Sequence, residues 1–151
     1  MLQRKLILIV AVLVVLGGAV WLATHREPIP HEPIYHGKAI SVWLDDQNFI
    51  GGSIVLADAS VRAVQAIGTK AIPYLLASLE CSGSQTNSAI KRHQAIYGFR
   101  ALGREARPAI PKIVNLVLTS SDFGIHYDAI NALAEAPEEA ITLFAQALES
   151  Q

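Results

Sequence analysis

Hydrophobic and polar positions divide the chain into one unbroken apolar run and a longer region in which apolar residues recur at helical spacing. The run covers residues 6–23, LILIVAVLVVLGGAVWLA, and holds 18 residues without a charge. A helix of that length, rising about 1.5 Å per residue, extends roughly 27 Å, close to the roughly 30 Å hydrocarbon core of a bilayer. The pattern therefore predicts a transmembrane signal anchor over residues 1–23.

The charges that flank this run predict its orientation. Arg4 and Lys5 precede it, whereas His25, Arg26 and Glu27 follow it with less positive charge. Because positive residues stay on the cytoplasmic side, we expect a single-pass inner-membrane protein with a cytoplasmic N-terminus and a periplasmic or extracellular domain. A cleaved signal peptide, with its cleavage site at residues 17–19, is the alternative, and it exports the domain as well.

Residues 24–40 are expected to form a Pro-rich linker. Proline lacks a backbone N–H and biases the residue before it toward extended conformations, so the prolines of this segment predict a stiff spacer. The histidines at positions 25, 31 and 36 lie six and five residues apart and share no common helix face. No carboxylate or cysteine completes a ligand set with them, and we therefore expect no metal site.

Three segments of the remaining chain align without gaps, at offsets of 35 and 31 residues: 60–68, 95–103 and 126–134. Each has apolar residues at its second, fifth and eighth positions and small residues at its fourth and seventh. Apolar spacing of three indicates one face of a helix, and small residues let a neighbouring helix approach closely. We call these predicted elements the A helices. Gly68 and Gly103 end the first two, where a left-handed residue belongs.

A second apolar pattern follows each A helix, over residues 71–79, 109–117 and 140–148. Pro73 and Pro111 occupy the same column of this pattern, near the start of a helix, where a missing N–H costs nothing. These elements are the predicted B helices. Each repeating unit is therefore expected to be a helical hairpin, an A helix and a B helix joined by a short turn.

The alternation of A and B helices resembles HEAT repeats, most closely the short bacterial variety. The stretch from Ala101 to Pro111, ALGREARPAIP, carries the resemblance most fully, and the match covers about residues 53–151. The third unit has Ala134 and Thr142 in place of the glycine and the proline. The resemblance implies an all-α fold, a short right-handed α-solenoid of about three HEAT-like helical hairpins preceded by the transmembrane helix. It also implies a protein-binding scaffold.

Two segments are expected to complete the repeat domain, residues 41–151. Ser41 is predicted to cap a short helix over residues 42–47, whose Trp43 and Leu44 would seal the end of the first unit. Residues 51–53, Gly-Gly-Ser, are predicted to cap the first A helix. A phosphate-binding loop is the less favoured interpretation, because no Gly-Lys-Ser/Thr pattern surrounds these glycines.

Composition narrows the class of protein. Of the 151 residues 52% are hydrophobic and 17% charged, and the net charge is −1, which excludes intrinsic disorder and a strongly basic nucleic-acid binder. The single cysteine, Cys81, excludes an internal disulfide. The sequence contains no serine-hydrolase or zinc-protease motif, and His126 lies in a packing column, so we expect neither an enzyme nor a cofactor.

Charged residues are segregated between the second and third units. Residues 88–112 hold six Lys or Arg and one Glu, whereas residues 113–151 hold six acids and no Lys or Arg. Three interpretations stay open: solvated faces, head-to-tail attraction between copies, and recognition of an acidic partner. For the last of these we predict partner-binding residues along one basic edge: Lys91, Arg100, Arg104 and Arg107.

These features together predict a membrane-tethered HEAT-repeat scaffold that mediates protein–protein interaction in the envelope. Its expected partners are the membrane, through residues 6–23, and an unidentified protein, which the basic edge suggests is acidic; no nucleic acid is expected. Two alternatives belong to other classes. One is an accessory subunit of a lyase-type enzyme, since some HEAT-like proteins assist pigment attachment to phycobiliproteins, and the other is a structural protein that self-assembles.

Overall fold

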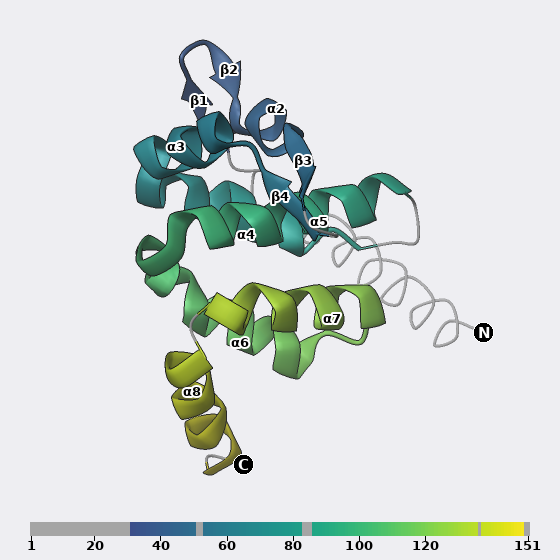
Figure 1. Cartoon of the computed structure of the whole chain (residues 1–151). Helices are drawn as coiled ribbons and strands as arrows, with labels where there is room; N and C mark the ends of the chain where they lie inside the picture. The colour runs from purple at the N-terminus through teal and green to yellow at the C-terminus, as the bar shows by residue number, and fades with distance from the viewer. Residues whose placement is uncertain (1–30, 51–52, 83–85, 136, 150–151) are drawn as a thin grey trace, which may run out of the picture.

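The computed structural model describes residues 31–50, 53–82, 86–135 and 137–149, and most of them are helical (Figure 1). The all-α class is confirmed, with two short β-hairpins before the first long helix. The predicted anchor, residues 1–23, lies outside the described residues. Within the described ranges, no helix combines the length and the apolar character that crossing a bilayer requires.

All the predicted A and B helices form. The A helices are α3 (Asp58–Ile67), α5 (Thr86–Leu102) and α7 (Phe123–Ala132). The B helices are α4 (Ile72–Leu79), α6 (Ile110–Thr119) and α8 (Pro137–Glu149). A 3-10 turn follows each A helix: η1 (Gly68–Ala71), η2 (Gly103–Ala109) and η3 (Leu133–Glu135). We refer to α3 with α4, α5 with α6, and α7 with α8 as the first, second and third units.

Local signals define several helix ends; the two glycines and the two prolines were expected, whereas the cap at Asp122 was not. Gly68 and Gly103 have positive φ angles of 62° and 55°, a conformation that is strained for residues with a Cβ. The prolines of the B helices stand in the first turns of α4 and α6, where an N–H would find no intrahelical acceptor. At the start of α7 the Asp122 carboxylate accepts hydrogen bonds from the backbone N–H groups of Gly124, at 2.8 Å, and Ile125, at 3.3 Å.

The closest helix packing runs between units. α4 packs against α5 and α6 against α7, while the A helices form a row in which α5 contacts both α3 and α7. This corrects the predicted hairpin, in which each B helix would pair with its own A helix. A small residue explains the close approach of α5 to α4, because a Cβ added to Gly98 would lie 2.5 Å from Cδ2 of Leu75. Each of α5 and α7 therefore lies on the B helix that precedes it.

Burial agrees with the predicted helical phase in the eighth column of all three units, whereas the second and fifth columns of the third unit, Tyr127 and Ile130, are exposed. The eighth column of the A helices is buried in all three units: Ile67, Leu102 and Leu133. The sixth column is exposed in the first two units and half-buried in the third: Gln65, Arg100 and Asn131. One hydrophobic core joins the three units.

The N-terminal part of the described chain forms a cap on the first unit, and here the structure differs from the prediction. The cap contains β1 (Ile34–Tyr35), β2 (Lys38–Ala39), α2 (Ile40–Leu44), β3 (Gln47–Ile50) and β4 (Ser53–Leu56). The predicted linker, residues 24–40, is wrong over its last part, because β1 and β2 pair antiparallel and Ile40 is fully buried. Positive φ at His36 and Gly37 gives the two-residue turn that suits such a hairpin.

The two predicted helix caps in this region are also wrong. Ser41 lies within α2, and its backbone N–H donates to Oε1 of Glu32 at 2.6 Å. Ser53 begins β4, which pairs antiparallel with β3, and the residue that precedes α3 is Ala57, so Ser53 does not cap α3. The chain reaches α3 through this second hairpin instead.

The sealing role predicted for the short helix is confirmed for Leu44, which is fully buried. Trp43 is half-buried, and its indole N–H donates to the Tyr35 carbonyl oxygen at 3.2 Å. Nearby in α4, burial raises the pKa of the Tyr74 phenol above its ordinary value, and the Glu32 carboxylate adds to that effect. The row of A helices is thus closed at its first end.

Candidate partner-binding surface

The predicted basic edge is not a single surface. Lys91 and Arg100 are both exposed on α5, but nine residues at about 100° each leave them half a turn out of phase, on opposite sides of the helix. The Arg100 guanidinium lies over the Tyr97 ring, 5.8 Å from its centroid. Arg104 follows in η2 and is exposed. The structure therefore keeps Arg100 and Arg104 at one end of α5 and separates Lys91 from them.

Several cations of the second unit are engaged within the molecule. Ion pairs with acids hold Arg92 to Asp128, Arg107 to Glu139, and Lys112 to Glu80. The Arg107–Glu139 pair joins Nη2 and Oε1 at 2.8 Å, so the predicted docking role of Arg107 competes with this contact. Two of these pairs link the basic second unit to the acidic third unit. The segregation of charge along the chain thus contributes to packing between neighbouring units.

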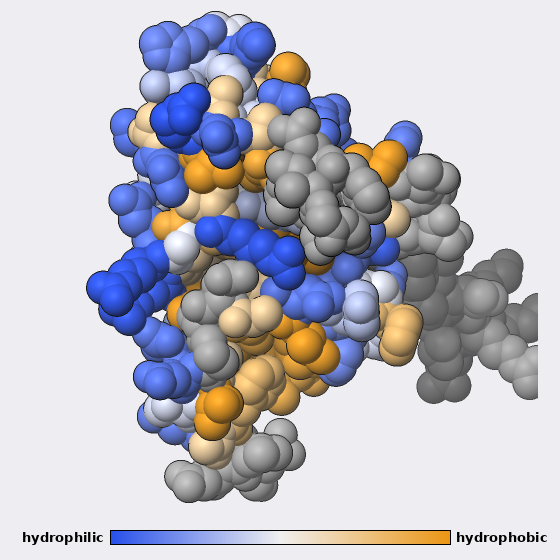
Figure 2. Space-filling model, in the orientation of Figure 1, coloured by the Kyte–Doolittle hydropathy of each residue, from blue (hydrophilic) through white to orange (hydrophobic). Residues whose placement is uncertain are grey.

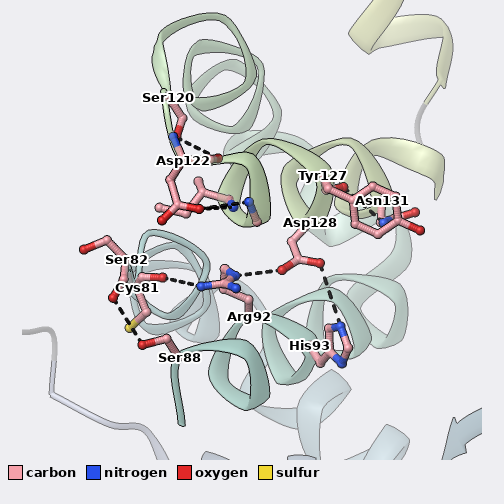
Figure 3. Close-up of polar contacts among 12 residues, drawn as sticks. Cys81, Ser82, Ser88, Arg92, His93, Ser120, Asp122, Tyr127, Asp128 and Asn131 are labelled. Carbon is pink, nitrogen blue, oxygen red and sulfur yellow. Dashed lines mark hydrogen bonds and ion pairs between the residues drawn. The ribbon is translucent and has the colours of Figure 1, made fainter. Parts of the chain in front are cut away.

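Arg92 and Asp128 form the most buried of these pairs (Figure 3). Only 6% of Arg92 is exposed, and its Nε donates to Oδ2 of Asp128 at 2.7 Å. Its Nη1 also donates to the Cys81 carbonyl oxygen, just after α4, at 2.7 Å. His93 Nε2 lies 3.8 Å from the other carboxylate oxygen. This cluster ties α5 to α7 and to the end of α4.

The sequence at the start of α7 leaves space for the Arg92 guanidinium. Gly124, in the first turn of α7, leaves room for the guanidinium, because a Cβ there would lie 2.7 Å from Nη2 of Arg92. Sequence reasoning missed the pair, since Arg92 stood in a basic run and was counted with the surface cations. No local signal indicates the pair, because Arg92 and Asp128 are 36 residues apart in the sequence.

The third unit exposes positions that the second unit buries. In the second column, Ile96 of α5 is 7% exposed and the aligned Tyr127 of α7 is 57% exposed. In the fifth column, Phe99 is 1% exposed and the aligned Ile130 is 48% exposed. The first isoleucine of the B helices shows the same difference between units. Ile141 is 66% exposed, whereas its counterparts in α4 and α6 are buried. We call Tyr127, Ile130 and Ile141 the open face.

The open face follows from the packing between units. α5 covers α4 and α7 covers α6, but among the described residues no A helix lies on α8, which packs mainly on α6. Phe123, Tyr127 and Ile130 stand at i, i+4 and i+7, on one side of α7, and the first two rings stack at 6.4 Å. Figure 2 shows apolar residues gathered in the lower part of the molecule, where Figure 1 places α7 and α8.

An open pocket of about 180 Å³ adjoins this face between α5 and α7. Tyr97, Tyr127, Arg100 and Asn131 contribute aromatic surfaces, a guanidinium and an amide to its lining. A side chain of a partner that combines an apolar body with a polar end fits such walls. Among the described residues, no three His, Cys, Asp or Glu side chains lie close enough together to hold a metal ion.

Comparison with known proteins adds no relative, because no protein-family model, curated protein or solved structure matches the chain. The residues of this surface favour contact with another chain, since their largest exposed groups are apolar and lie at positions that neighbouring helices cover elsewhere in the molecule.

Proposed function

We propose that the protein is a membrane-tethered scaffold of HEAT-like units that binds a partner protein through the open face. The observation that carries the proposal is the exposure of Tyr127, Ile130 and Ile141, whose aligned counterparts in the second unit belong to the core. Exposing large apolar groups to water is unfavourable, and a partner that covers them regains about 25 cal/mol for each Å² removed from water. The proposed role is binding, and catalysis is not part of it.

The repeat architecture supports the scaffold proposal. The A helices recur at offsets of 35 and 31 residues, each is followed by a 3-10 turn and a B helix, and each later A helix lies on the preceding B helix. We propose that this stacking forms a short right-handed α-solenoid, in which successive units build an extended surface.

The tether is proposed from the apolar run of residues 6–23 and from Arg4 and Lys5 before it. We expect the full chain to stay in the membrane fraction after high-salt and carbonate washing. We also expect its C-terminus to be reached by protease only from outside the inner membrane. A soluble protein whose N-terminus begins at Val20 would contradict the tether and support a cleaved signal peptide.

An acidic partner at Arg100 and Arg104 stays a second proposal for the same scaffold. The pocket beside Arg100 favours it, because aromatic rings and a guanidinium lie together there. Replacing both arginines by Glu would weaken capture of such a partner, and circular dichroism would show that the variant is folded. Undiminished capture would limit docking to the open face.

The open face is tested by photo-crosslinking in living cells. A benzophenone amino acid at position 127, 130 or 141 is expected to give the same crosslinked partner from all three sites. Positions 65 and 90, which are exposed on α3 and α5, serve as matched controls and are expected to give none. Crosslinks of equal yield from the control positions, or none from the three test positions, would contradict binding at the open face.

A further inference from the structure

We infer that the cap docks on the lipid headgroups of the membrane that holds the tether, with the β1–β2 hairpin and α2 facing the bilayer. This inference rests on the proposed function, because it needs residues 6–23 to lie in the membrane, and it adds the surface of the domain that the membrane covers. It follows from the length of chain between the apolar run and the cap, from the residues on the outer side of the cap and from the contacts of its acids.

Few residues separate the proposed tether from the cap. The apolar run ends at Ala23 and the described chain begins at His31, so the seven residues 24–30 link the two. An extended chain spans at most about 3.3–3.6 Å per residue, so the link from Ala23 to His31 reaches no further than about 29 Å. The β1–β2 hairpin begins shortly afterwards, at Ile34. The tether therefore holds the cap close to the bilayer.

The row of helices places the open face at the other end of the molecule. Figure 1 shows the β1–β2 hairpin at one end and α8 at the opposite end, with α3, α5 and α7 in order between them. Axes of packed helices lie about 8–10 Å apart, so α7 lies up to about 20 Å beyond α3. A cap that docks on the bilayer therefore leaves the open face in water, where a partner protein reaches it.

Aromatic and basic side chains of the cap lie together. The Trp43 ring is half-buried beside Tyr35, with ring centroids 6.3 Å apart, and Nζ of Lys38 lies over the indole, 4.7 Å from its centroid. The indole N–H already donates to the Tyr35 carbonyl oxygen, so the ring enters a less polar layer without an unpaired donor. Trp and Tyr are enriched at the boundary between headgroups and acyl chains, and Lys extends its amine from there toward the polar layer. This cluster therefore suits a lipid surface.

Two exposed apolar residues, Ile34 and Val42, extend the cluster. Val42 points away from the molecule, because Ile40 and Leu44 are fully buried two residues before and after it, and two residues correspond to about 200° of helix. Ile34 lies in β1, in the hairpin that projects from the end of the molecule (Figure 1). A hairpin that enters the headgroup layer by its tip brings both of its faces into contact with lipid. We call four residues the outer cap: Ile34, Lys38, Val42 and Trp43.

The acids of the cap are engaged by groups of α2 and of the helix row. The Glu32 carboxylate accepts a backbone N–H of α2 at 2.6 Å. Asp45 accepts a hydrogen bond from the buried side chain of Gln94 in α5, and the Asp46 carboxylate lies 3.5 Å from a buried hydroxyl of α3. These contacts hold the acids toward the helices, whereas Lys38 is exposed in the outer cap. The outer cap therefore favours the phosphate groups of lipids, and anionic lipids most.

A lipid surface fits the outer cap better than a partner protein does. A stable protein–protein interface buries about 800 Å² on each partner and involves about 20–30 residues a side. The outer cap is much smaller than that. A bilayer joined to the cap by a short link is present at a high effective concentration, about millimolar for short flexible linkers, so weak contacts are enough to dock it.

The test uses the full chain in nanodiscs of phosphatidylcholine and phosphatidylglycerol. The sequence has two tryptophans, so Trp21→Phe leaves Trp43 as the sole indole. Phospholipid that is brominated on its acyl chains quenches an indole at the boundary between headgroups and acyl chains, whereas iodide quenches an indole in water. We expect brominated lipid to remove about half of the Trp43 fluorescence, because indole rings lie at this boundary.

Two control chains calibrate the quenching. The first carries Trp21→Phe, Trp43→Phe and Phe123→Trp, which places the sole indole at an exposed position of α7. Brominated lipid is expected to leave its fluorescence unchanged. The second carries Trp43→Phe alone and keeps Trp21, whose quenching shows that the apolar run lies in the bilayer.

Variants of the Trp21→Phe chain locate the contact. Adding Ile34→Ser and Val42→Ser is expected to reduce the quenching of Trp43 by brominated lipid at least about threefold and to increase its quenching by iodide. The matched control adds Ile90→Ser and Leu118→Ser, which change exposed residues of α5 and α6, and is expected to be quenched as its parent is. Circular dichroism would show that both variants are folded.

Four results would overturn the inference. They are equal quenching by lipid of Trp43 and of the indole at position 123, unchanged quenching of Trp43 after Ile34→Ser and Val42→Ser, protection of Trp43 from iodide without quenching by lipid, and unquenched Trp21. The third would favour a protein on the outer cap, and the fourth would overturn the tether as well. Binding at the open face is judged separately by the crosslinks from positions 127, 130 and 141, so its failure is distinguishable from the failure of this inference.

Discussion

The second and third units share one pattern and differ in what covers it. Both have an A helix with apolar second, fifth and eighth columns and a B helix with an isoleucine at the aligned position, Ile110 or Ile141. In the second unit these columns are buried, whereas in the third unit the second and fifth columns are exposed and only the eighth is buried. An apolar column therefore indicates that a helix can pack against a neighbour. The position of that helix in the row of A helices determines whether the column is buried.

The largest effect is expected where the two units agree, in the eighth column. Leu102→Asp is expected to unfold the domain, because it removes about 1.5–3 kcal/mol of burial and leaves an unpaired carboxylate in the core at a cost of several kcal/mol more. That total approaches the whole stability of a small domain, about 5–15 kcal/mol. Gln65→Asp, in the exposed sixth column, is the control and is expected to melt as the wild type does. Similar melting curves for the two variants would contradict the helical phase.

Substitutions in the fifth column of the A helices compare directly how much burial contributes to stability in the second and third units. Phe99→Ala is expected to lower the free energy of unfolding by about 3–5 kcal/mol, because it leaves a cavity in a packed core. Ile130→Ala, at the aligned position of α7, is expected to cost less than about 1 kcal/mol, since the side chain is already half in water. Chemical denaturation of the two variants would check this, and equal losses would show that the open face is covered.

Substitutions in the buried Arg92–Asp128 ion pair measure how much this contact between the second and third units contributes to stability. Asp128→Ala is expected to cost about 3 kcal/mol, because it leaves the Arg92 guanidinium buried without its carboxylate. The double variant Arg92→Met and Asp128→Leu fills the same space with apolar groups and is expected to recover most of that loss. A double-mutant cycle measured by urea unfolding would show the coupling, and additive losses would mean that the two side chains do not depend on each other.

The smallest effect on stability is expected at Arg107–Glu139, the exposed ion pair between the second and third units. Glu139→Gln removes the partner of Arg107, but 60% of the Arg107 side chain and 40% of the Glu139 side chain are exposed, so the loss is expected to stay below about 1 kcal/mol. Thermal melts at low and high salt would check it, because added salt is expected to remove the difference between variant and wild type. A loss as large as that of Asp128→Ala would show that this pair is not screened by solvent.

The helices were predictable because their signals are local. Apolar spacing, Gly68 and Gly103 at helix ends, and prolines in first turns each act within one or two turns of helix. The second β-hairpin had a local signal too, since Gly51 and Gly52 separate two apolar segments, and a two-glycine turn there predicts paired strands. The two strands were not predicted because those glycines were interpreted as a helix cap.

The surface was harder to predict, because it depends on contacts between distant residues. Nothing near Arg92 in the sequence indicates that it is buried against Asp128, 36 residues away. The predicted basic edge therefore counted charges that the fold neutralises, and it joined Lys91 to Arg100 although they lie on opposite sides of α5. The exposure of Tyr127 and Ile130 likewise depends on what packs beside α7, which no local pattern contains.

The position of α8 has a consequence for how the molecule opens. Because α8 packs mainly on α6 and on η3, its local unfolding breaks the contacts of few elements, whereas α5 opens only when contacts on several sides are lost. Amide hydrogens of α8 are therefore expected to exchange with solvent sooner than those of α5. A partner bound to α8 at the open face would slow that exchange by the factor 1 + [L]/Kd, so the exchange rate of α8 would show how much of the open face is occupied.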